Sequence, residues 1–427
     1  MTTIKPFRAV IYNQEKISDL SSVVCPPYDI ISPARQEAYQ EKNPNNFTHI
    51  LLSKDIPGED KYRRAGQYFR NWLKNKVLVQ DEKPAIYHYE QEYKVRGQKL
   101  TRSGFIALLH LEKKKSTVFG HEHTHLEPRE DRLKLIRQVK ANLSPIFVIF
   151  GDKKRVIQRV IEPHLAHKKP FLEVRDDEGI RHTLWRVDDP EILQTIQDSM
   201  SGENIFIADG HHRYEVSCAY RDEMEAKMSE KSKGEEDFNF TLAYFTNTHS
   251  HGLTVFPYHR LLKLDFDLHM DSFILHLKEY FSIEEMKDKA RLFFLMEKAG
   301  IAEHVLGIYK DKRFLLLRLK NNKILDRIIG DKPSAYRQLD VCVLNYIVFR
   351  NVMGVDFDDK TQFIYTPDAE ECIENVNENT RHAAFFLNPT KVEQITAIAL
   401  EGEKMPPKST YFYPKVLSGL VVNKHDE

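Results

Sequence analysis

The sequence predicts a mixed α/β protein with more than one domain. Residues 85–95 and 100–111 alternate apolar and polar side chains as strands do, whereas apolar residues recur at helical spacing after Pro128. The length of 427 residues suits roughly two to three domains, and 41% hydrophobic residues can form sizeable cores. We expect three regions: an N-terminal mixed α/β region (1–150), a region around a DGHHR motif (151–250) and a C-terminal α/β region with a KST tail motif (251–427).

The charge balance and the cysteines narrow the class of protein. The 63 Lys and Arg residues equal the 63 Asp and Glu residues in number, so no basic excess favours nucleic acid or an anionic membrane as partner. The four cysteines form no CxxC pair, which argues against a zinc ribbon and a disulfide framework. The first residues, MTTIKPFRAV, contain no apolar signal core, and no apolar run approaches the ~18 residues that span a bilayer. We expect a cytoplasmic protein without a membrane partner.

Capping and turn residues predict the elements of the first region. We expect a helix after Ser32-Pro33 and another over residues 62–78, followed by a hairpin of the two alternating segments. Pro128, with acidic residues close behind it, starts a further helix, which Ser144-Pro145 ends. Residues 146–150 then form a buried strand.

Two further patterns organise the rest of the chain. The apolar residues 205–208 predict a strand that runs through Gly210 into a long helix, and the charged segment 229–237 predicts a solvated loop. The continuous apolar segment 339–349 predicts a buried element that Gly354 caps. Other expected elements are a helix from about Val156, a hairpin turn at 176–179, a helix from Asp189 and a last helix over 390–400 that stops at Gly402.

The segment IFIADGHHRYE carries the strongest indication of a binding site. Gly210 lets the backbone approach a ligand, and the following helix presents amides at the positive end of its dipole. With the guanidinium of Arg213 these amides form an anion site suited to phosphate, beside which His211 and His212 donate or carry protons near neutral pH. The alternative is a structural turn in which Asp209 caps the helix and both histidines are solvated.

A second segment, Gly120-His121-Glu122-His123-Thr124-His125, matches the HExxH signature of helical zinc sites. A glycine before it, a proline soon after it and the lack of an apolar face oppose the buried helix that such a site requires. We therefore expect an active-site loop in which Glu122 is an acid or base, with no metal ligands. A zinc helix and a metal bound in another geometry are the alternatives.

Three other segments are weaker candidates. The prolines of Cys25-Pro26-Pro27-Tyr28-Asp29 hold the chain rigid and position Asp29, unless this segment is only a stiff connector. His259 and Arg260 form a cationic pair in FPYHR. Lys408-Ser409-Thr410 is similar to the end of a P-loop but lacks its glycines and strand, although a lysine and two hydroxyls can contact phosphate. For each segment the alternative is a structural or solvated loop.

Six motifs together resemble a known family. They are CPPYDIIS, GHEHT with the downstream Asp131-Arg132-Leu133, ANLSPIF, IADGHHRYE, FPYHR and MPPKSTYFYPK, and they follow one another over nearly the whole chain. In this combination and order they resemble the bacterial and archaeal family catalogued as domain of unknown function 1015. The resemblance implies membership of that family and transfers no activity.

The DGHHR turn also resembles the phosphate-binding turn of the ParB and sulfiredoxin superfamily, in particular that of its free serine kinases. In that superfamily the turn holds nucleotide phosphates at a helix N-terminus. The resemblance implies a ParB/sulfiredoxin-like core in which Asp209, Gly210, His211, His212 and Arg213 bind a nucleotide or a phosphorylated substrate. It is confined to this turn and gives no position for the catalytic acid of the kinases.

The leading hypothesis is an enzyme of phosphoryl transfer, most like a free serine kinase that uses ADP or ATP with Mg²⁺. Phosphoserine hydrolysis is a close variant. Asp29 or Glu122 would orient the hydroxyl nucleophile or hold Mg²⁺, and His211 and His212 would move protons. The rival hypotheses are a ParB-like nucleotide-gated binding protein and a non-enzymatic interaction protein. Zero net charge and the lack of an evident helix-turn-helix weigh against DNA as the target of a ParB-like protein.

If these motifs serve one reaction, their charged residues must meet. A phosphate dianion needs cations on more than one side, and no single segment supplies them. We therefore expect Asp29, Glu122, Arg213, Arg260 and Lys408 to line one pocket. His259, Ser409 and Thr410 are expected to add phosphate contacts there.

Overall fold

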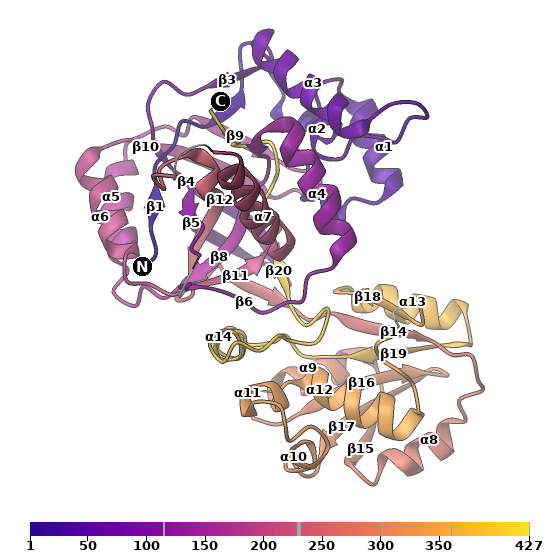
Figure 1. Ribbon diagram of the computed structural model, residues 1–427. Helices are drawn as coiled ribbons and strands as arrows, with labels where there is room; N and C mark the ends of the chain where they lie inside the picture. Colours follow the sequence, from indigo (N-terminus) through magenta and orange to yellow (C-terminus); the bar gives the residue numbers. More distant parts are fainter. Residues whose placement is uncertain (114–115, 229–231, 301, 360, 427) are drawn as a thin grey trace. The chain divides into compact units, whose positions relative to one another are not determined.

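The computed structural model describes the chain except for residues 114–115, 229–231, 301, 360 and 427. It divides into two compact units (Figure 1). The first unit contains residues 1–120, 124–253 and 414–427, and the second contains residues 121–123 and 254–413. Among the described residues no helix has the length and apolar character needed to cross a membrane. All four cysteines are free thiols.

A nine-stranded sheet forms the centre of the first unit. Its order is β6-β11-β8-β12-β5-β4-β10-β9, with β1 paired to β5, and only the pairs β6-β11 and β8-β12 are parallel. The strands are β1 (Ile4–Lys5), β4 (Ile86–Val95), β5 (Gln98–His110), β6 (Val118–Gly120), β8 (Ile146–Phe150), β9 (Leu172–Arg175), β10 (Arg181–Val187), β11 (Ile205–Asp209) and β12 (Phe240–Asn247). Two small pairs accompany it: β2 (Val10–Tyr12) with β3 (Leu78–Gln80), and β7 (Ala141–Asn142) with β21 (Asn423–Lys424).

The helices of the first unit pack on this sheet and on each other. Alternate apolar residues of the central strands bury one face against α5 and α6, with the rings of Phe105 and Phe245 stacked 4.8 Å apart. Helices α4 and α7 lie side by side through Ile136, Val216 and Tyr220 (Figure 1). The helices are α1 (Pro33–Lys42), α2 (Thr48–Leu51), α3 (Lys61–Lys74), α4 (Leu126–Val139), α5 (Val156–Leu165), α6 (Pro190–Met200) and α7 (His211–Lys227).

Several local predictions for the first unit are confirmed. Ser32 caps α1 through its hydroxyl, and Asp189 caps α6 through its carboxylate. The β4-β5 hairpin turns at Arg96 and Gly97, which both have positive φ as a type I′ turn requires. Strand β8 has the predicted bounds. Of the charged segment 229–237, residues 229–231 lie outside the described residues.

Two helix boundaries in this unit differ from the prediction. The helix expected over 62–78 ends at Lys74, since Lys76 adopts φ 55° and Leu78 already begins β3. Helix α4 begins at Leu126 rather than at Pro128, because a proline is tolerated anywhere in a first turn, where its missing N–H needs no partner. It ends at Val139 rather than at Ser144-Pro145, because the next residue, Lys140, adopts the left-handed conformation.

The second unit has an antiparallel six-stranded sheet of order β15-β17-β16-β19-β14-β18 (Figure 1). Helices α9 and α13 contribute Leu292, Met296, Cys372 and Val376 to its core. The strands are β14 (His259–Lys263), β15 (Phe281–Met286), β16 (Val305–Lys310), β17 (Arg313–Leu319), β18 (Phe363–Thr366) and β19 (His382–Phe386), with β13 (Thr254–Phe256) and β20 (Tyr411–Tyr413) as a separate pair. The helices are α8 (Met270–Leu277), α9 (Lys289–Ala299), α10 (Ile324–Ile328), α11 (Ser334–Arg337), α12 (Asp340–Cys342), the π-helical Val343–Met353, α13 (Ala369–Glu378) and α14 (Val392–Leu400).

The mixed α/β class and the main features of the C-terminal region are confirmed. The apolar segment 339–349 is helical and largely buried, and Gly354 caps it with φ 68°. The last helix ends at Leu400, and Gly402 follows with φ 72°. The nine-stranded sheet takes strands from both 1–150 and 151–250, and the three-region division stays a prediction about domains.

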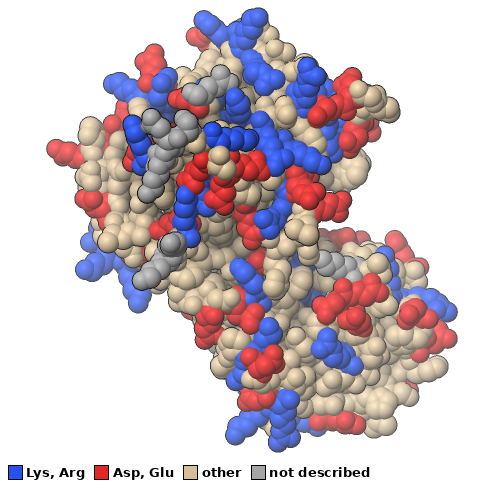
Figure 2. All heavy atoms as spheres, viewed as in Figure 1, with Lys and Arg blue, Asp and Glu red and all other residues tan. Residues whose placement is uncertain are grey.

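Charged side chains of both signs lie on the face drawn in Figure 2. On the face drawn in Figure 2, Lys and Arg alternate with Asp and Glu over each unit. This agrees with a formal net charge of zero and offers no extended basic stripe on that face for a nucleic-acid backbone.

Candidate phosphate site

The DGHHR motif forms the predicted strand-turn-helix. Strand β11 ends at Asp209, Gly210 adopts φ +93°, and α7 begins at His211. A side chain at Gly210 would be strained, because L-residues rarely adopt this φ, and its Cβ would lie 2.9 Å from the guanidinium carbon of Arg213. Glycine therefore lets the chain turn sharply while the Arg213 side chain folds back over the turn.

Asp209 is held between two cations. Its Oδ1 lies 2.5 Å from Lys415 Nζ, and its Oδ2 lies 2.6 Å from Arg213 Nη2. Burial alone would raise the pKa of this carboxyl group, but Lys415 and Arg213 outweigh burial and hold the pKa well below its ordinary value. Asp209 does not cap α7, whose N-cap residue is Gly210, so the alternative of an aspartate-capped turn is wrong in this respect.

The C-terminal tail brings Lys415 to this turn. Arg102 donates from Nη2 to the Pro414 carbonyl oxygen at 2.5 Å, and Gln91 Nε2 donates to the Lys415 carbonyl oxygen at 2.9 Å. Both donors lie on strands of the large sheet, where the Arg102 guanidinium also stacks 4.5 Å from the ring of Phe147. The backbone of the tail is thereby fixed, so the lysine side chain reaches Asp209.

Other motifs meet the same turn. The ANLSPIF motif reaches it because Arg213 Nη1 donates to the Pro145 carbonyl oxygen. The HEHTH segment reaches it through its last two residues: the His125 N–H donates to His212 Nε2 at 3.0 Å, and the Thr124 hydroxyl donates to Glu215. In this arrangement the Nε2 of His212 is an acceptor, so a proton can sit only on Nδ1 of the neutral ring.

The CPPYD motif contributes Tyr28 to a small cavity beside Arg213. The cavity has a volume of about 60 Å³, and the Arg132 guanidinium lies 4.4 Å above the Tyr28 ring. Burial, with the neighbouring Asp29 carboxylate, raises the pKa of Tyr28 to about 12. Asp29 itself is exposed on a short 3-10 helix, Tyr28–Ile30. Further lining residues are Ser144, Val216, Ser217 and Thr241.

The turn has an excess of positive charge. Lys415 and Arg213 face the single carboxylate of Asp209, and the N-terminus of a 17-residue helix adds the positive end of its dipole. Both cations are partly accessible, each with 12% of its side chain exposed. Such a combination favours an anion in front of the turn.

Lys415 is the residue that the sequence analysis missed. It closes the motif MPPKSTYFYPK, in which only Lys408, Ser409 and Thr410 drew attention. No local pattern links a lysine to an aspartate 206 positions earlier. Lys415 itself was included only as the last residue of the motif that takes part in the family resemblance.

The FPYHR and KST motifs form a different cluster, in the second unit. Arg260 is 2% exposed and donates to the carbonyl oxygens of Tyr258 and Lys408, the latter at 3.0 Å. Burial lowers the pKa of this guanidinium to about 10. His259 Nδ1 accepts from the Leu387 N–H at 3.3 Å, and burial lowers the pKa of the imidazole to about 4.

The KST residues bond mainly within this cluster. Lys408 is exposed with φ 55°, and its Nζ lies 5.2 Å from the centre of the Tyr258 ring. The Ser409 hydroxyl donates to the Pro406 carbonyl oxygen at 2.6 Å, and Thr410 Oγ1 lies 3.2 Å from His121 Nε2. These contacts stabilise the loop between α14 and β20.

Residues 121–125 are not helical, so the segment lacks the helix that the HExxH zinc site requires. Within the described part of the chain, no group of three or more His, Cys, Asp or Glu side chains is placed to hold a metal. Asp29 and Arg213 belong to the first unit, and Glu122, Arg260 and Lys408 to the second. Their meeting in one pocket stays a prediction.

Comparison with known proteins assigns the family. Residues 4–342 match the family described as "Protein of unknown function (DUF1015)". The chain belongs to this family. No curated protein matches this DUF1015 member.

Similar solved structures are distant. A free serine kinase in complex with AMP is 14% identical with a TM-score of 0.33, over 70% of this chain and 88% of the kinase. SbnI with a C-terminal truncation from Staphylococcus aureus is 10% identical with a TM-score of 0.37, over 74% and 86%. A conserved hypothetical protein from Pyrococcus furiosus is 15% identical with a TM-score of 0.33, over 72% and 92%.

Proposed function

We propose that the turn between β11 and α7 binds a phosphate group of a nucleotide or of a phosphorylated small molecule. The observation that carries the proposal is the pairing of one carboxylate, Asp209, with two cations at the positive end of a long helix. Such a turn has a surplus positive charge and a fixed geometry, which are the properties of phosphate sites at helix N-termini. A bound phosphate would interact with Arg213, Lys415 and the first amides of α7.

The reaction that we propose at this site is phosphoryl transfer. Its transition state requires alignment and charge stabilisation more than covalent chemistry, and the paired cations supply such charge. In the finer form of the proposal the acceptor is free serine and the donor ADP or ATP, or phosphoserine is hydrolysed. His211 and His212 would carry protons, and Asp29 would orient the hydroxyl nucleophile.

The residues restrict where Mg²⁺ can bind. Both oxygens of Asp209 already accept from cations, so this carboxylate is a poor ligand for Mg²⁺. The exposed Asp29 fits as a single carboxylate ligand, because Mg²⁺ needs only one or two carboxylates when phosphate oxygens and water complete its shell. Bound there, the ion would neutralise charge between the phosphates.

Ligand binding and turnover test the proposal separately. Titration calorimetry with ADP, ATP and phosphoserine measures binding, and ³¹P NMR follows serine plus nucleotide, and phosphoserine alone, over time. Arg213→Ala should weaken phosphate-ligand binding about 10- to 100-fold, the effect of one charge-assisted contact. The matched control is Arg291→Ala, which removes an exposed arginine from the first turn of α9 and should change nothing.

Each outcome has a definite meaning. If none of the three ligands binds, the phosphate site is wrong. If nucleotide binds without turnover of serine or phosphoserine, the chain is a nucleotide-dependent binding protein and the enzymatic part of the proposal fails. If Arg291→Ala weakens binding as much as Arg213→Ala, the loss is unspecific.

A further inference from the structure

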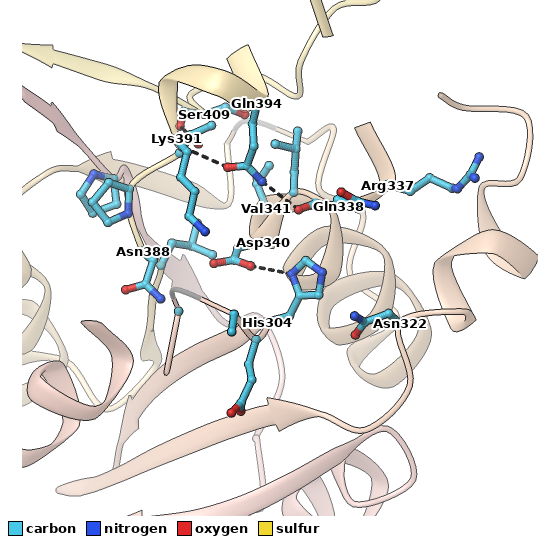
Figure 3. A pocket seen from close by; sticks show the side chains of 18 of the residues that line it. His304, Asn322, Arg337, Gln338, Asp340, Val341, Asn388, Lys391, Gln394 and Ser409 are labelled. Atoms are coloured by element: carbon cyan, nitrogen blue, oxygen red, sulfur yellow. Dashed lines mark hydrogen bonds and ion pairs between the residues drawn. The ribbon is translucent and has the colours of Figure 1, made fainter. Parts of the chain in front are cut away.

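A polar cavity of about 450 Å³ lies within the second unit, and of the sequence motifs only FPYHR, through Pro257 and Tyr258, and KST, through Ser409, contribute to its lining. Its volume lies in the range of small-molecule sites. Four segments form most of its walls: the residues before β16, residues 322–326 around the start of α10, the link between α11 and α12, and the residues after β19. The side chains that matter for its chemistry are His304, Asp340, Asn388 and Lys391 (Figure 3).

One wall carries a carboxylate oriented by a histidine. His304 Nδ1 lies 2.7 Å from Asp340 Oδ1, and the two side chains are 13% and 20% exposed. Burial raises the pKa of Asp340, although the bond to His304 acts in the opposite direction. A carboxylate in such surroundings is stabilised further by a cationic group that enters the cavity.

The opposite wall carries positive charge. Lys391 is the N-cap residue of α14, and its side chain extends into the cavity toward Asp340 (Figure 3). The Gln394 side chain accepts from the Lys391 N–H at 3.0 Å and donates to the Gln338 carbonyl oxygen at 3.0 Å. The start of α14 is therefore fixed to the neighbouring wall, with its positive dipole end at the cavity.

Three other charged residues of the lining, Glu303, Asp326 and Arg337, form ion pairs of their own. Arg337 Nε lies 2.7 Å from Asp326, and Glu303 lies 2.8 Å from Arg318. Asp340 and Lys391 are charges of opposite sign on the two walls, and Lys323 adds a further positive charge to the lining.

Gly300 leaves room for the side-chain amide of Asn388, which forms part of the lining between these charges. The Asn388 Nδ2 donates to the Met296 carbonyl oxygen at 3.1 Å, and a Cβ at Gly300 would lie 2.1 Å from that nitrogen. Only glycine leaves room for this orientation of Asn388. The cavity therefore has a built polar lining.

We propose that this cavity binds a zwitterion of the amino-acid class, with its ammonium group against Asp340 and its carboxylate against Lys391 and the start of α14. A molecule with both charges satisfies both walls. A simple anion would be repelled by the Asp340 carboxylate, and a simple cation would be repelled by the Lys391 ammonium group. The site lies wholly within the second unit and does not depend on the phosphate site.

The test uses the full-length protein without nucleotide, so that failure of the phosphate site does not affect it. Titration calorimetry with each of the twenty amino acids identifies the best ligand. Its decarboxylated amine and its deaminated acid should each bind at least about tenfold more weakly, because each lacks one charged contact. Lys391→Gln should weaken binding by a similar factor, and Lys298→Gln, an exposed lysine on α9, should leave it unchanged.

Three results would overturn this assignment. They are the absence of binding by any amino acid at millimolar concentration, equal binding of the deaminated acid, and unchanged binding by Lys391→Gln. Asp340→Asn should also weaken binding. If that variant fails to fold, as far-ultraviolet circular dichroism would show, the exposed Lys391 and the ligand series still decide.

Discussion

Two arginines of the family motifs, one in each unit, are used in opposite ways. Arg213 pairs with the Asp209 carboxylate, and 12% of its side chain is exposed. Arg260 is 2% exposed and donates to backbone carbonyl oxygens, and within the described residues it forms no ion pair. A cation in a shared motif is therefore not by itself a ligand-binding group.

The pKa shifts express the same difference. At the β11-α7 turn two cations hold the pKa of Asp209 low, so the charges there stabilise one another. At Arg260 burial lowers the pKa to about 10, because the charged form lacks both water and a carboxylate. We therefore expect Arg260 to stabilise the loop around Lys408, and Arg213 to bind ligands.

The largest effect is expected at Asp209. Asp209→Ala leaves Arg213 and Lys415 facing each other beside the positive end of α7, and breaking a buried ion pair in this way costs about 3–5 kcal/mol of unfolding free energy. Hydrogen exchange should speed up in β11 and α7 and stay unchanged in β14 and β19. A matched control is Asp189→Ala, which removes only a helix cap at about 1 kcal/mol. Equal costs for the two variants would contradict the role of the paired cations.

Acid should destabilise both units, in part through one deeply buried histidine in each. Burial lowers the pKa of His259 in the second unit and of His425 in the first to about 4, whereas an unfolded histidine titrates near 6.5. The unfolded chain therefore binds more protons between these values, so unfolding free energy falls as pH drops from about 6.5 to about 4. Each histidine contributes on the order of 3 kcal/mol to this loss.

Chemical denaturation at several pH values measures this loss. His259→Asn should reduce the pH dependence of the second unit only, as hydrogen exchange in β14 would show. A flat stability between pH 6.5 and 4 would mean that neither imidazole is neutral in the folded chain.

Local patterns in the sequence were enough to predict most elements and the β11-α7 turn of the candidate phosphate site. The apolar run before Gly210 and the helical spacing after it fixed the turn, because these signals act over a few residues. Lys415 and the His304–Asp340 pair could not be predicted from local patterns, because tertiary packing alone brings them to their partners. The C-terminal end of α4 was predicted too late in the chain, because the residue that ends it in the left-handed conformation is Lys140, whereas glycine or asparagine is usual there.

Replacing Arg260 tests whether this arginine supports the fold or binds a ligand. Arg260→Met leaves the carbonyl oxygens of Tyr258 and Lys408 without this donor but also removes a buried charge, so a net loss of about 1–3 kcal/mol is expected. Nucleotide affinity should not change. The control Arg313→Met removes a partly exposed arginine with surface ion pairs and should cost less than about 1 kcal/mol. If Arg260→Met folds and loses nucleotide binding, Arg260 belongs to the phosphate site after all.

The smallest expected effect separates backbone strain from side-chain contact at the turn. Gly210→Ala should cost about 1–2 kcal/mol, because an L-residue is forced to φ +93°. Gly179→Ala provides the matched control, since Gly179 has φ +78° but a Cβ added there would have no atom within 4 Å, whereas the Cβ at position 210 would meet the Arg213 guanidinium. Denaturant unfolding should therefore show a larger loss for Gly210→Ala than for Gly179→Ala, and calorimetry should show weaker phosphate-ligand binding for Gly210→Ala alone. Equal losses and unchanged affinity would mean that the Arg213 guanidinium does not need its place over the turn, and that its pairing with Asp209 serves only the fold.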